Sequence, residues 1–208
     1  MIKAALKIFI WMHNISYKAI SALVVRENNG LHPKHKILNY HKFFLDNVSE
    51  NDTVLDIGCG NGAVAYDLSQ KSKRVIAIDI VKNNIEIARE KFSHENLEYI
   101  RGDATNFNFQ EKFDVIILSN VLEHIKNRIE FLSKIKNLAP KILIRVPLLT
   151  RDWLSVYKKE NGFEYRLDST HYIEYTEENF KDELEKSGLE IENYYIKFGE
   201  LYATIKQN

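Results

Sequence analysis

A glycine-rich loop preceded by an acidic residue is the first place in this chain where residue types and spacing suggest chemistry. Residues 58–63 read Gly-Cys-Gly-Asn-Gly-Ala and follow an apolar run at 53–57. Glycines let the backbone approach a ligand closely, because they carry no Cβ. The pattern fits a loop for a dinucleotide and equally a loop for another adenosine-bearing cofactor. Asp56 distinguishes the two, since a carboxylate beside the loop repels a pyrophosphate and attracts an ammonium group.

Two further acids follow apolar runs in the same manner. Asp79 follows the run at 74–78, where its carboxylate can accept hydrogen bonds from both hydroxyls of a ribose. Asp103 follows the run at 97–100 and is placed to accept from an adenine amino group, with Ala104 leaving room for the ring. The alternative is that these acids cap the helices that follow them, as Asp often does. Three acids at the ends of three successive runs, together with the glycine loop, favour a ligand site.

The elements that must position these acids alternate along the chain. Apolar runs typical of strands are separated by segments whose apolar residues recur at helical spacing. The predicted strands lie at 53–57, 74–78, 97–100, 113–118 and 141–146, and the predicted helices at 63–70, 83–92, 126–138 and 176–187. This alternation predicts right-handed crossovers and a parallel sheet with helices on both faces. Ligands of such sheets bind outside the carboxyl ends of the strands, where the three acids lie.

The two ends of the chain depart from this alternation. Strand candidates at 189–195 and 200–205 are joined by a few residues around Gly199, which suits a hairpin with an antiparallel last strand. The expected fold class is α/β: a Rossmann-like, doubly wound, seven-stranded and mostly parallel sheet with a C-terminal antiparallel hairpin. Residues 1–50 are expected to form an N-terminal helical extension or cap, with a break between its two helices at 31–34. Residues 51–208 are expected to form the main domain.

The stretch at 54–62, Val-Leu-Asp-Ile-Gly-Cys-Gly-Asn-Gly, resembles motif I of the class I S-adenosylmethionine-dependent methyltransferases. Gly102-Asp103-Ala104 and residues 113–116 resemble later motifs of that family in order and spacing, so the resemblance covers roughly residues 50–147. It implies S-adenosyl-L-methionine as cofactor, which carries an ammonium and a sulfonium charge but no phosphate. The cofactor-binding residues that we expect are Asp56, Gly58, Cys59, Gly60, Asp79, Ile80, Asp103, Ala104, Ser119 and Asn120.

Two histidines are the candidates for catalysis, because methyl transfer to a hydroxyl oxygen requires removal of its proton. His124 lies in a stretch that resembles the Leu-Glu-His sequence of family members acting on small molecules. His171 lies in an acceptor-side insert, 148–176, which is rich in aromatic and charged residues. Its Asp168-x-x-His171 resembles a stretch in some methyltransferases of sugars and polysaccharides. Either histidine could be the base; alternatively, His124 packs beside the cofactor and the insert is only a lid.

The sequence predicts no metal site with the same clarity. We therefore assign no metal ligand, and we keep as an alternative that Glu123, Asp168 and His171 bind a divalent cation that polarises the acceptor hydroxyl.

The single cysteine, Cys59, cannot form an internal disulfide or a thiolate cluster, so nothing demands an oxidising compartment. A small side chain in a cramped loop is sufficient reason for it.

These observations predict a methyltransferase that acts on a hydroxyl oxygen of a small or glycan-like acceptor. One alternative is a lipid-linked or quinone-like acceptor at the membrane surface; another, of a different class, is an NAD-dependent oxidoreductase. A nucleic-acid partner is not expected, because 29 basic residues balance 29 acidic ones. Residues 119–122 also lack the Pro-Pro-Tyr type of turn that resembles amino-directed DNA enzymes.

Residues 1–25 carry an apolar pattern that Lys3, Lys7 and Lys18 interrupt. The uncharged stretches are shorter than the roughly 18–20 residues that a spanning helix needs, so we expect an amphipathic helix. Such a helix could cap the site, pack against a second copy in a homodimer, or lie on a membrane surface. The expected location is therefore the cytoplasm, with peripheral membrane contact through this helix as an open alternative.

Overall fold

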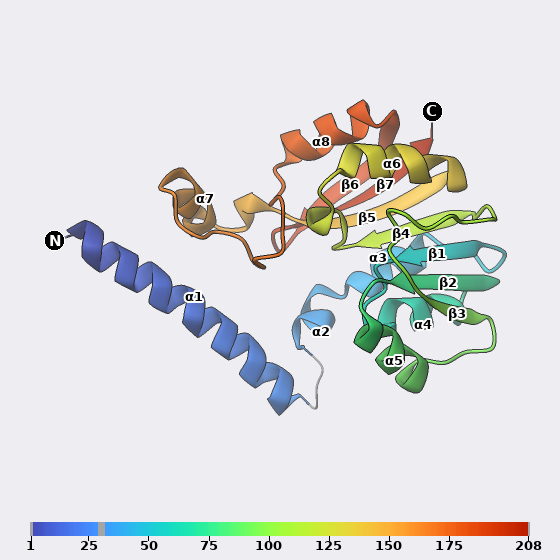
Figure 1. The fold of residues 1–208 in the computed structure, drawn as a ribbon, viewed down its shortest axis with the longest axis horizontal. Helices are drawn as coiled ribbons and strands as arrows, with labels where there is room; N and C mark the ends of the chain where they lie inside the picture. The colour runs from blue at the N-terminus through green and yellow to red at the C-terminus, as the bar shows by residue number, and fades with distance from the viewer. Residues whose placement is uncertain (1, 29–31, 208) are drawn as a thin grey trace.

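A computed structural model describes residues 2–28 and 32–207, which form one sheet with helices on both faces (Figure 1). The strands are β1 (Thr53–Ile57), β2 (Arg74–Asp79), β3 (Leu97–Arg101), β4 (Val115–Ser119), β5 (Lys141–Pro147), β6 (Leu189–Lys197) and β7 (Glu200–Gln207). Each strand overlaps one that the sequence predicts, and β4 begins two residues later than expected. The α/β fold class is confirmed.

The order of the strands in the sheet is β3-β2-β1-β4-β5-β7-β6. Strands β1 to β5 are parallel, whereas β7 runs antiparallel to both β5 and β6. The hairpin turn between β6 and β7 places Phe198 at φ 50° and Gly199 at φ 73°. A short turn with left-handed residues reverses the chain, so the antiparallel hairpin predicted from the spacing around Gly199 is present. The sheet order changes direction at β1, which places the glycine loop at the topological switch point.

Helices cover the sheet in two layers. They are α3 (Tyr40–Asp46), α4 (Ala63–Ser69) and α5 (Lys82–Lys91) on one face, and α6 (Arg128–Ile135) and α8 (Glu177–Lys186) on the other. Two fully buried aromatic side chains mark the two cores: Phe44 of α3 belongs to the first and Phe180 of α8 to the second. Short 3-10 turns η1 (Leu122–His124), η2 (Lys136–Leu138) and η3 (Leu149–Arg151) complete the connections, and the insert contains α7 (Trp153–Glu160). The sheet is thus enclosed on both faces and its strand ends remain free for a site.

The N-terminal extension consists of α1 (Ile2–Glu27), α2 (Lys34–Leu38) and α3. The predicted break at 31–34 falls where α2 begins, with Pro33 as its N-cap, although residue 31 itself lies outside the described residues. A further break was missed: Asn39 adopts φ 49°, which ends α2 and starts α3 in a new direction. Asn tolerates the left-handed region, so one residue suffices to separate the helices.

Helix α1 extends away from the sheet and passes beside α7 (Figure 1). Its contacts with the insert are few: Ile10 is buried, and Asn14 accepts a hydrogen bond from Lys158 Nζ at 2.7 Å. Most of its large apolar side chains are exposed, Phe9 and Trp11 among them. By length and composition alone, α1 is also long and apolar enough to cross a membrane, which the interrupting lysines had argued against.

Candidate active site

The carboxyl ends of β1, β2 and β3 bring the three predicted acids to one edge of the sheet. Ile57 pairs with Ile78 and Asp79 with Arg101, so the parallel register brings all three strands to the same edge. Asp56 lies within β1, Asp79 ends β2, and Asp103 follows β3 after one glycine. The alternation of strands and helices therefore gathers them as expected.

The glycine loop follows β1 and lies tightly against the neighbouring elements. Gly58 has φ 70°, and a Cβ added there would lie 2.5 Å from Cγ2 of Val121. Its N–H donates to the carbonyl of Ile78 at 2.7 Å, which ties the loop to β2. Gly60 has φ 55° but open space around it. Glycine at position 58 is thus required by both backbone conformation and packing, and glycine at position 60 by conformation only.

Asp79 and Asp103 are both hydrogen-bonded within their own loops. Asp79 accepts from Gly60 N at 2.9 Å and from Val81 N at 2.8 Å. Asp103 accepts from the hydroxyl of Thr105 at 2.7 Å, and this bond lowers the pKa of Asp103 below its ordinary value. Asp103 therefore stabilises the turn that follows it, much as the capping alternative predicts. A carboxylate has about four acceptor positions, so each acid can still accept from a ligand.

Two neighbouring cavities contain the predicted cofactor residues. The larger has a volume of about 870 Å³ and is lined by Asp79, Ile80, Asp103 and Ala104, among others. The smaller, of about 230 Å³, is lined by Asp56, Cys59, Gly60 and Ser119, among others. Gly58 and Asn120 line both. One elongated ligand can therefore extend from one cavity into the other past the glycine loop.

Asp56 dominates the electrostatics of the smaller cavity. Its side chain is buried, and Oδ2 has no hydrogen-bond partner among the described residues. Burial, and then the nearby Asp79, raise the pKa of Asp56 to about 8. The amide oxygen of Asn120, buried and also without a described partner, lies at the wall shared with the larger cavity. These unpaired acceptors fit a ligand that carries an ammonium group, because such a group would donate to them.

Sequence reasoning missed several residues of the smaller cavity, among them Lys34, Tyr40 and Arg145. Lys34 and Tyr40 come from α2 and α3, and Arg145 comes from β5, beyond the predicted motifs. Arg145 is buried, forms an ion pair with Glu200, and stacks 3.8 Å from the centre of the Tyr40 ring. Residues of α2 and α3 thus line this end of the site, while the role of cap for residues 1–50 stays a prediction. A basic residue inside an otherwise apolar strand was the signal available in the sequence.

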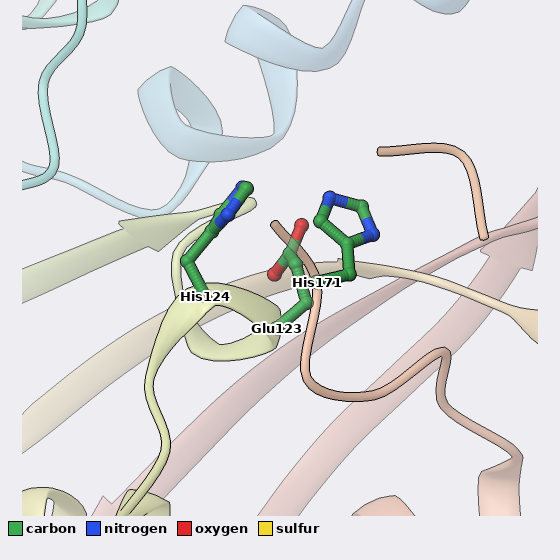
Figure 2. Close-up of side chains that lie close together, drawn as sticks. All are labelled: Glu123, His124 and His171. Atoms are coloured by element: carbon green, nitrogen blue, oxygen red, sulfur yellow. The ribbon is translucent and has the colours of Figure 1, made fainter. Parts of the chain in front are cut away.

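A second group of polar residues lies beside the larger cavity. Figure 2 shows the Glu123 carboxylate between the imidazole rings of His124 and His171. One potential ligand atom from each residue lies within 4.8 Å of the other two, so the three could hold a metal ion. The two rings meet edge to face with their centres 4.5 Å apart. The histidines predicted separately as bases are thus neighbours, although they come from η1 and from the insert.

The protonation of this group follows from its burial. Glu123 is fully buried, and neither of its carboxylate oxygens has a hydrogen-bond partner among the described residues. Burial raises the pKa of Glu123 to about 8. Burial, and then the neighbouring His171, lower the pKa of His124, so its ring is neutral at pH 7. A neutral imidazole can accept a proton or bind a metal.

Hydrogen bonds orient both imidazoles through the same nitrogen. Nδ1 of His124 lies 3.0 Å from the hydroxyl of Thr170, which in turn donates to Asp168 at 2.8 Å. Nδ1 of His171 lies 3.0 Å from Glu174, whose carboxylate is buried and paired with Arg151 at 2.9 Å. Both rings therefore keep Nε2 for another partner.

Asp168 lies behind the cluster and supports it through Thr170. Its carboxylate also accepts from the backbone N–H of Thr170 at 2.8 Å. The group that could bind a metal is therefore Glu123, His124 and His171, with His124 in the place that the sequence alternative gave to Asp168. Glu174 and Arg151 were not singled out from the sequence, because only the folded insert places them behind His171.

Comparison with known proteins agrees with this architecture. A family model described as "Methyltransferase domain" matches residues 31–194, which is most of the chain. The ubiquinone biosynthesis O-methyltransferase of Rickettsia bellii is 31% identical over 101 residues, which cover 47% of this chain and 42% of the relative. N-methyltransferase 4 of Papaver somniferum is 35% identical over 97 residues, covering 43% and 27%. The chain thus spans less than half the length of these curated relatives.

Solved structures share the fold at low sequence identity. A TehB-like SAM-dependent methyltransferase from Corynebacterium glutamicum has a TM-score of 0.62 at 17% identity, covering 95% of this chain and 99% of its own. The N-methyltransferase NodS from Bradyrhizobium japonicum, in complex with S-adenosyl-L-homocysteine, has a TM-score of 0.62 at 16% identity, with 84% and 85% covered. The family match over most of the chain, on a sheet with this glycine loop, shows that the chain belongs to the class I S-adenosylmethionine-dependent methyltransferases.

Proposed function

We propose that this methyltransferase transfers its methyl group to a hydroxyl oxygen of the acceptor. The observation that carries the proposal is the group formed by Glu123, His124 and His171 at the wall of the larger cavity, which His124 itself lines. A hydroxyl must lose its proton during transfer, and neutral imidazoles are suited to assist that loss near pH 7. An oxidoreductase with a nicotinamide cofactor, the alternative from another class, is disfavoured by the family match.

The cofactor is proposed to lie across both cavities. Its amino-acid end fits the smaller cavity, where Asp56 can accept from the ammonium group and the cations Lys34 and Arg145 face its carboxylate. Its adenosine part fits the larger cavity, with Asp79 toward the ribose hydroxyls and Asp103 toward the adenine. In this placement the methyl group lies near Gly58 and Asn120, where the two cavities meet.

In the proposed reaction the acceptor oxygen attacks the methyl carbon in line with the carbon–sulfur bond. The C–O bond forms as the C–S bond breaks, the electron pair remains on sulfur, and S-adenosylhomocysteine leaves with a neutral thioether in place of the sulfonium. Positioning supplies much of the rate enhancement in such a displacement. His124 is the base that we favour, because it lines the cavity and its Nδ1 is oriented by Thr170 and Asp168.

The acceptor that we propose first is a small or glycan-like hydroxyl compound. Polar side chains of the insert and of the η1–α6 connection line the larger cavity, among them Lys126, Asn127, Thr170 and Tyr172. Such side chains can hydrogen-bond a hydroxylated acceptor.

The expected location in the cytoplasm stays a prediction, as does a homodimer formed through residues 1–25.

A second candidate is a quinone-like or lipid-linked acceptor taken from a membrane surface. Exposed apolar side chains occur along the whole of α1: Ile2, Ile8, Phe9, Trp11, Met12, Ile15, Ile20 and Leu23. The same helix carries four basic residues and one acidic residue, which favours anionic headgroups. Several relatives are named ubiquinone biosynthesis O-methyltransferases, which agrees with an acceptor of this kind.

Acceptor profiling tests the proposed chemistry. The protein is incubated with S-adenosylmethionine and panels of sugars, catechols, quinols and amines, and S-adenosylhomocysteine is quantified. We expect turnover with hydroxyl acceptors and a loss of at least tenfold in the His124→Gln variant, consistent with removal of a general base. Turnover with amines alone would contradict the proposal. Isothermal titration with S-adenosylhomocysteine checks that each variant still binds the cofactor.

Vesicle flotation distinguishes the two acceptor classes. If α1 binds a membrane, the protein should float with phosphatidylglycerol vesicles and much less with phosphatidylcholine vesicles. Replacing Phe9, Trp11 and Ile15 of α1 by Ser should abolish flotation. The control replaces Ile129 and Phe198, exposed apolar residues of the main domain, and should leave it unchanged. No flotation of the native protein would remove the membrane candidate.

A further inference from the structure

The Glu123 carboxylate is the most conspicuous unpaired group beside the acceptor cavity. Both of its oxygens are buried, and the described residues provide neither with a hydrogen-bond donor. Leaving a buried polar group unsatisfied is unfavourable, and more so for a charged group. Ordinary core packing would replace such a side chain with an apolar one, so its presence points to a partner that the polypeptide does not supply.

The two neighbouring imidazoles are arranged to share that partner. His124 and His171 each have Nδ1 engaged with a second residue, Thr170 and Glu174 respectively. Histidine ligands of metals are usually held in this way, with the second ring nitrogen bonded to a carboxylate or another acceptor. The ion pair with Arg151 holds the buried Glu174 carboxylate in place behind His171, where it is the hydrogen-bond partner of Nδ1. The orientation of the His171 ring is therefore set before any ion binds.

We propose that Glu123, His124 and His171 bind a divalent ion of the first transition series, and that this ion holds the acceptor hydroxyl. Two imidazoles and one carboxylate are a common donor set for such ions and leave coordination positions for a substrate oxygen. Bonds of about 2.0–2.2 Å place donor atoms at most about 4 Å apart, so the present separation of up to 4.8 Å requires only a small rotation of side chains.

This inference rests on the proposed transfer to oxygen and changes the assignment of roles within it. The metal-bound hydroxyl would release its proton to solvent, because the ion lowers its pKa. The resulting oxygen attacks the methyl carbon, and S-adenosylhomocysteine leaves with the electron pair of the C–S bond. The two histidines would then act as ligands that position the acceptor, in place of a base.

Cobalt(II) titration of the full, untagged chain tests the site without any acceptor. The protein is stripped with EDTA, dialysed, and titrated with CoCl₂ while visible absorption is recorded, followed by competition with ZnCl₂. We expect one Co²⁺ per chain, displaced by Zn²⁺. The variants Glu123→Gln and His171→Gln should each bind at least tenfold more weakly. The variant His41→Gln is the matched control, since it removes a histidine paired with a carboxylate, Asp67, outside this group, and should bind normally.

The outcomes separate this inference from the proposed function. Absence of a saturable site, or binding that persists unchanged in both ligand variants, would overturn the metal site. Titration of the same preparations with S-adenosylhomocysteine reports on folding and on the cofactor site. If the cofactor binds and hydroxyl acceptors are methylated in the presence of EDTA, the proposed role of the metal is refuted, whereas the proposed transfer to oxygen is supported. If Co²⁺ binds as expected but only amines are methylated, the site exists and the proposed acceptor chemistry is wrong.

Discussion

The cofactor side and the acceptor side of the site are built in different ways. On the cofactor side, Asp79 and Asp103 follow successive strands and are hydrogen-bonded within their own loops. On the acceptor side, Glu123 is buried without a described partner, and the histidines beside it come from segments that meet only in the fold. Asp56 is the exception on the cofactor side, since its Oδ2 is also buried without a described partner. The cofactor side is thus held mostly by its own loops, whereas the acceptor side is assembled from distant segments, and we expect acceptor specificity to depend on the latter.

The largest expected effect concerns the glycine loop of the cofactor side. In Gly58→Ala the new Cβ would meet Val121 at 2.5 Å in a left-handed backbone, whereas in Gly60→Ala only the backbone conformation is strained. We expect the free energy of unfolding to fall by about 3 kcal/mol in the first and about 1 kcal/mol in the second. The affinity for S-adenosylhomocysteine should fall more than tenfold only in the first. Denaturant unfolding measures the loss of stability and calorimetry measures the loss of affinity. Equal losses in the two variants would contradict the role that we assign to the contact between Gly58 and Val121.

That loop also shows what sequence spacing can predict. The three acids and Gly58 were predicted because each lies at or just beyond the end of a strand, and parallel strands bring their ends together. Each of His124 and His171 was predicted as a candidate base, but their proximity was not. The insert that carries His171 is far from His124 in sequence: its Thr170, which contacts His124, lies 46 residues away. Lys34, Tyr40 and Arg145 were missed for the same reason. Arg145 gave a local signal, as a basic residue in an apolar strand, but nothing local indicates that Lys34 and Tyr40 of the N-terminal extension lie beside Asp56.

A smaller effect is expected from Asp79, which serves the loop and the ligand together. Asp79→Ala removes the buried carboxylate that accepts hydrogen bonds from Gly60 N and Val81 N. In our proposal the same carboxylate also accepts hydrogen bonds from the ribose hydroxyls. We expect affinity for S-adenosylhomocysteine to fall by about 1–3 kcal/mol. Calorimetry measures this, with Glu98→Ala as a control that removes an exposed carboxylate of β3. An unchanged affinity in Asp79→Ala would show that the ribose lies elsewhere.

A pH dependence is expected from Asp56. Its pKa is raised by burial to about 8, whereas an unfolded Asp titrates near 4. Between these values the folded state keeps a proton that the unfolded state has lost, so the free energy of unfolding should fall as pH rises, by about 1 kcal/mol per unit. Glu123, whose pKa is also raised to about 8, adds to the same slope, so Asp56→Asn should make the slope shallower by about 1 kcal/mol per unit without removing it. Denaturant titrations at pH 5, 6 and 7 measure it, and a steeper or unchanged slope in the variant would refute the assignment.

The most direct test of the division between the two sides compares Asp56→Asn with Glu123→Gln. Both changes replace a buried carboxylate with an amide of similar size, one on each side of the site. Titration with S-adenosylhomocysteine should show a clear loss of affinity in Asp56→Asn, because an amide, unlike the carboxyl group, cannot ionise when the ammonium group binds. Glu123→Gln should bind within about twofold of the native protein, since Glu123 faces the acceptor side. A loss of cofactor affinity in Glu123→Gln with none in Asp56→Asn would contradict the account.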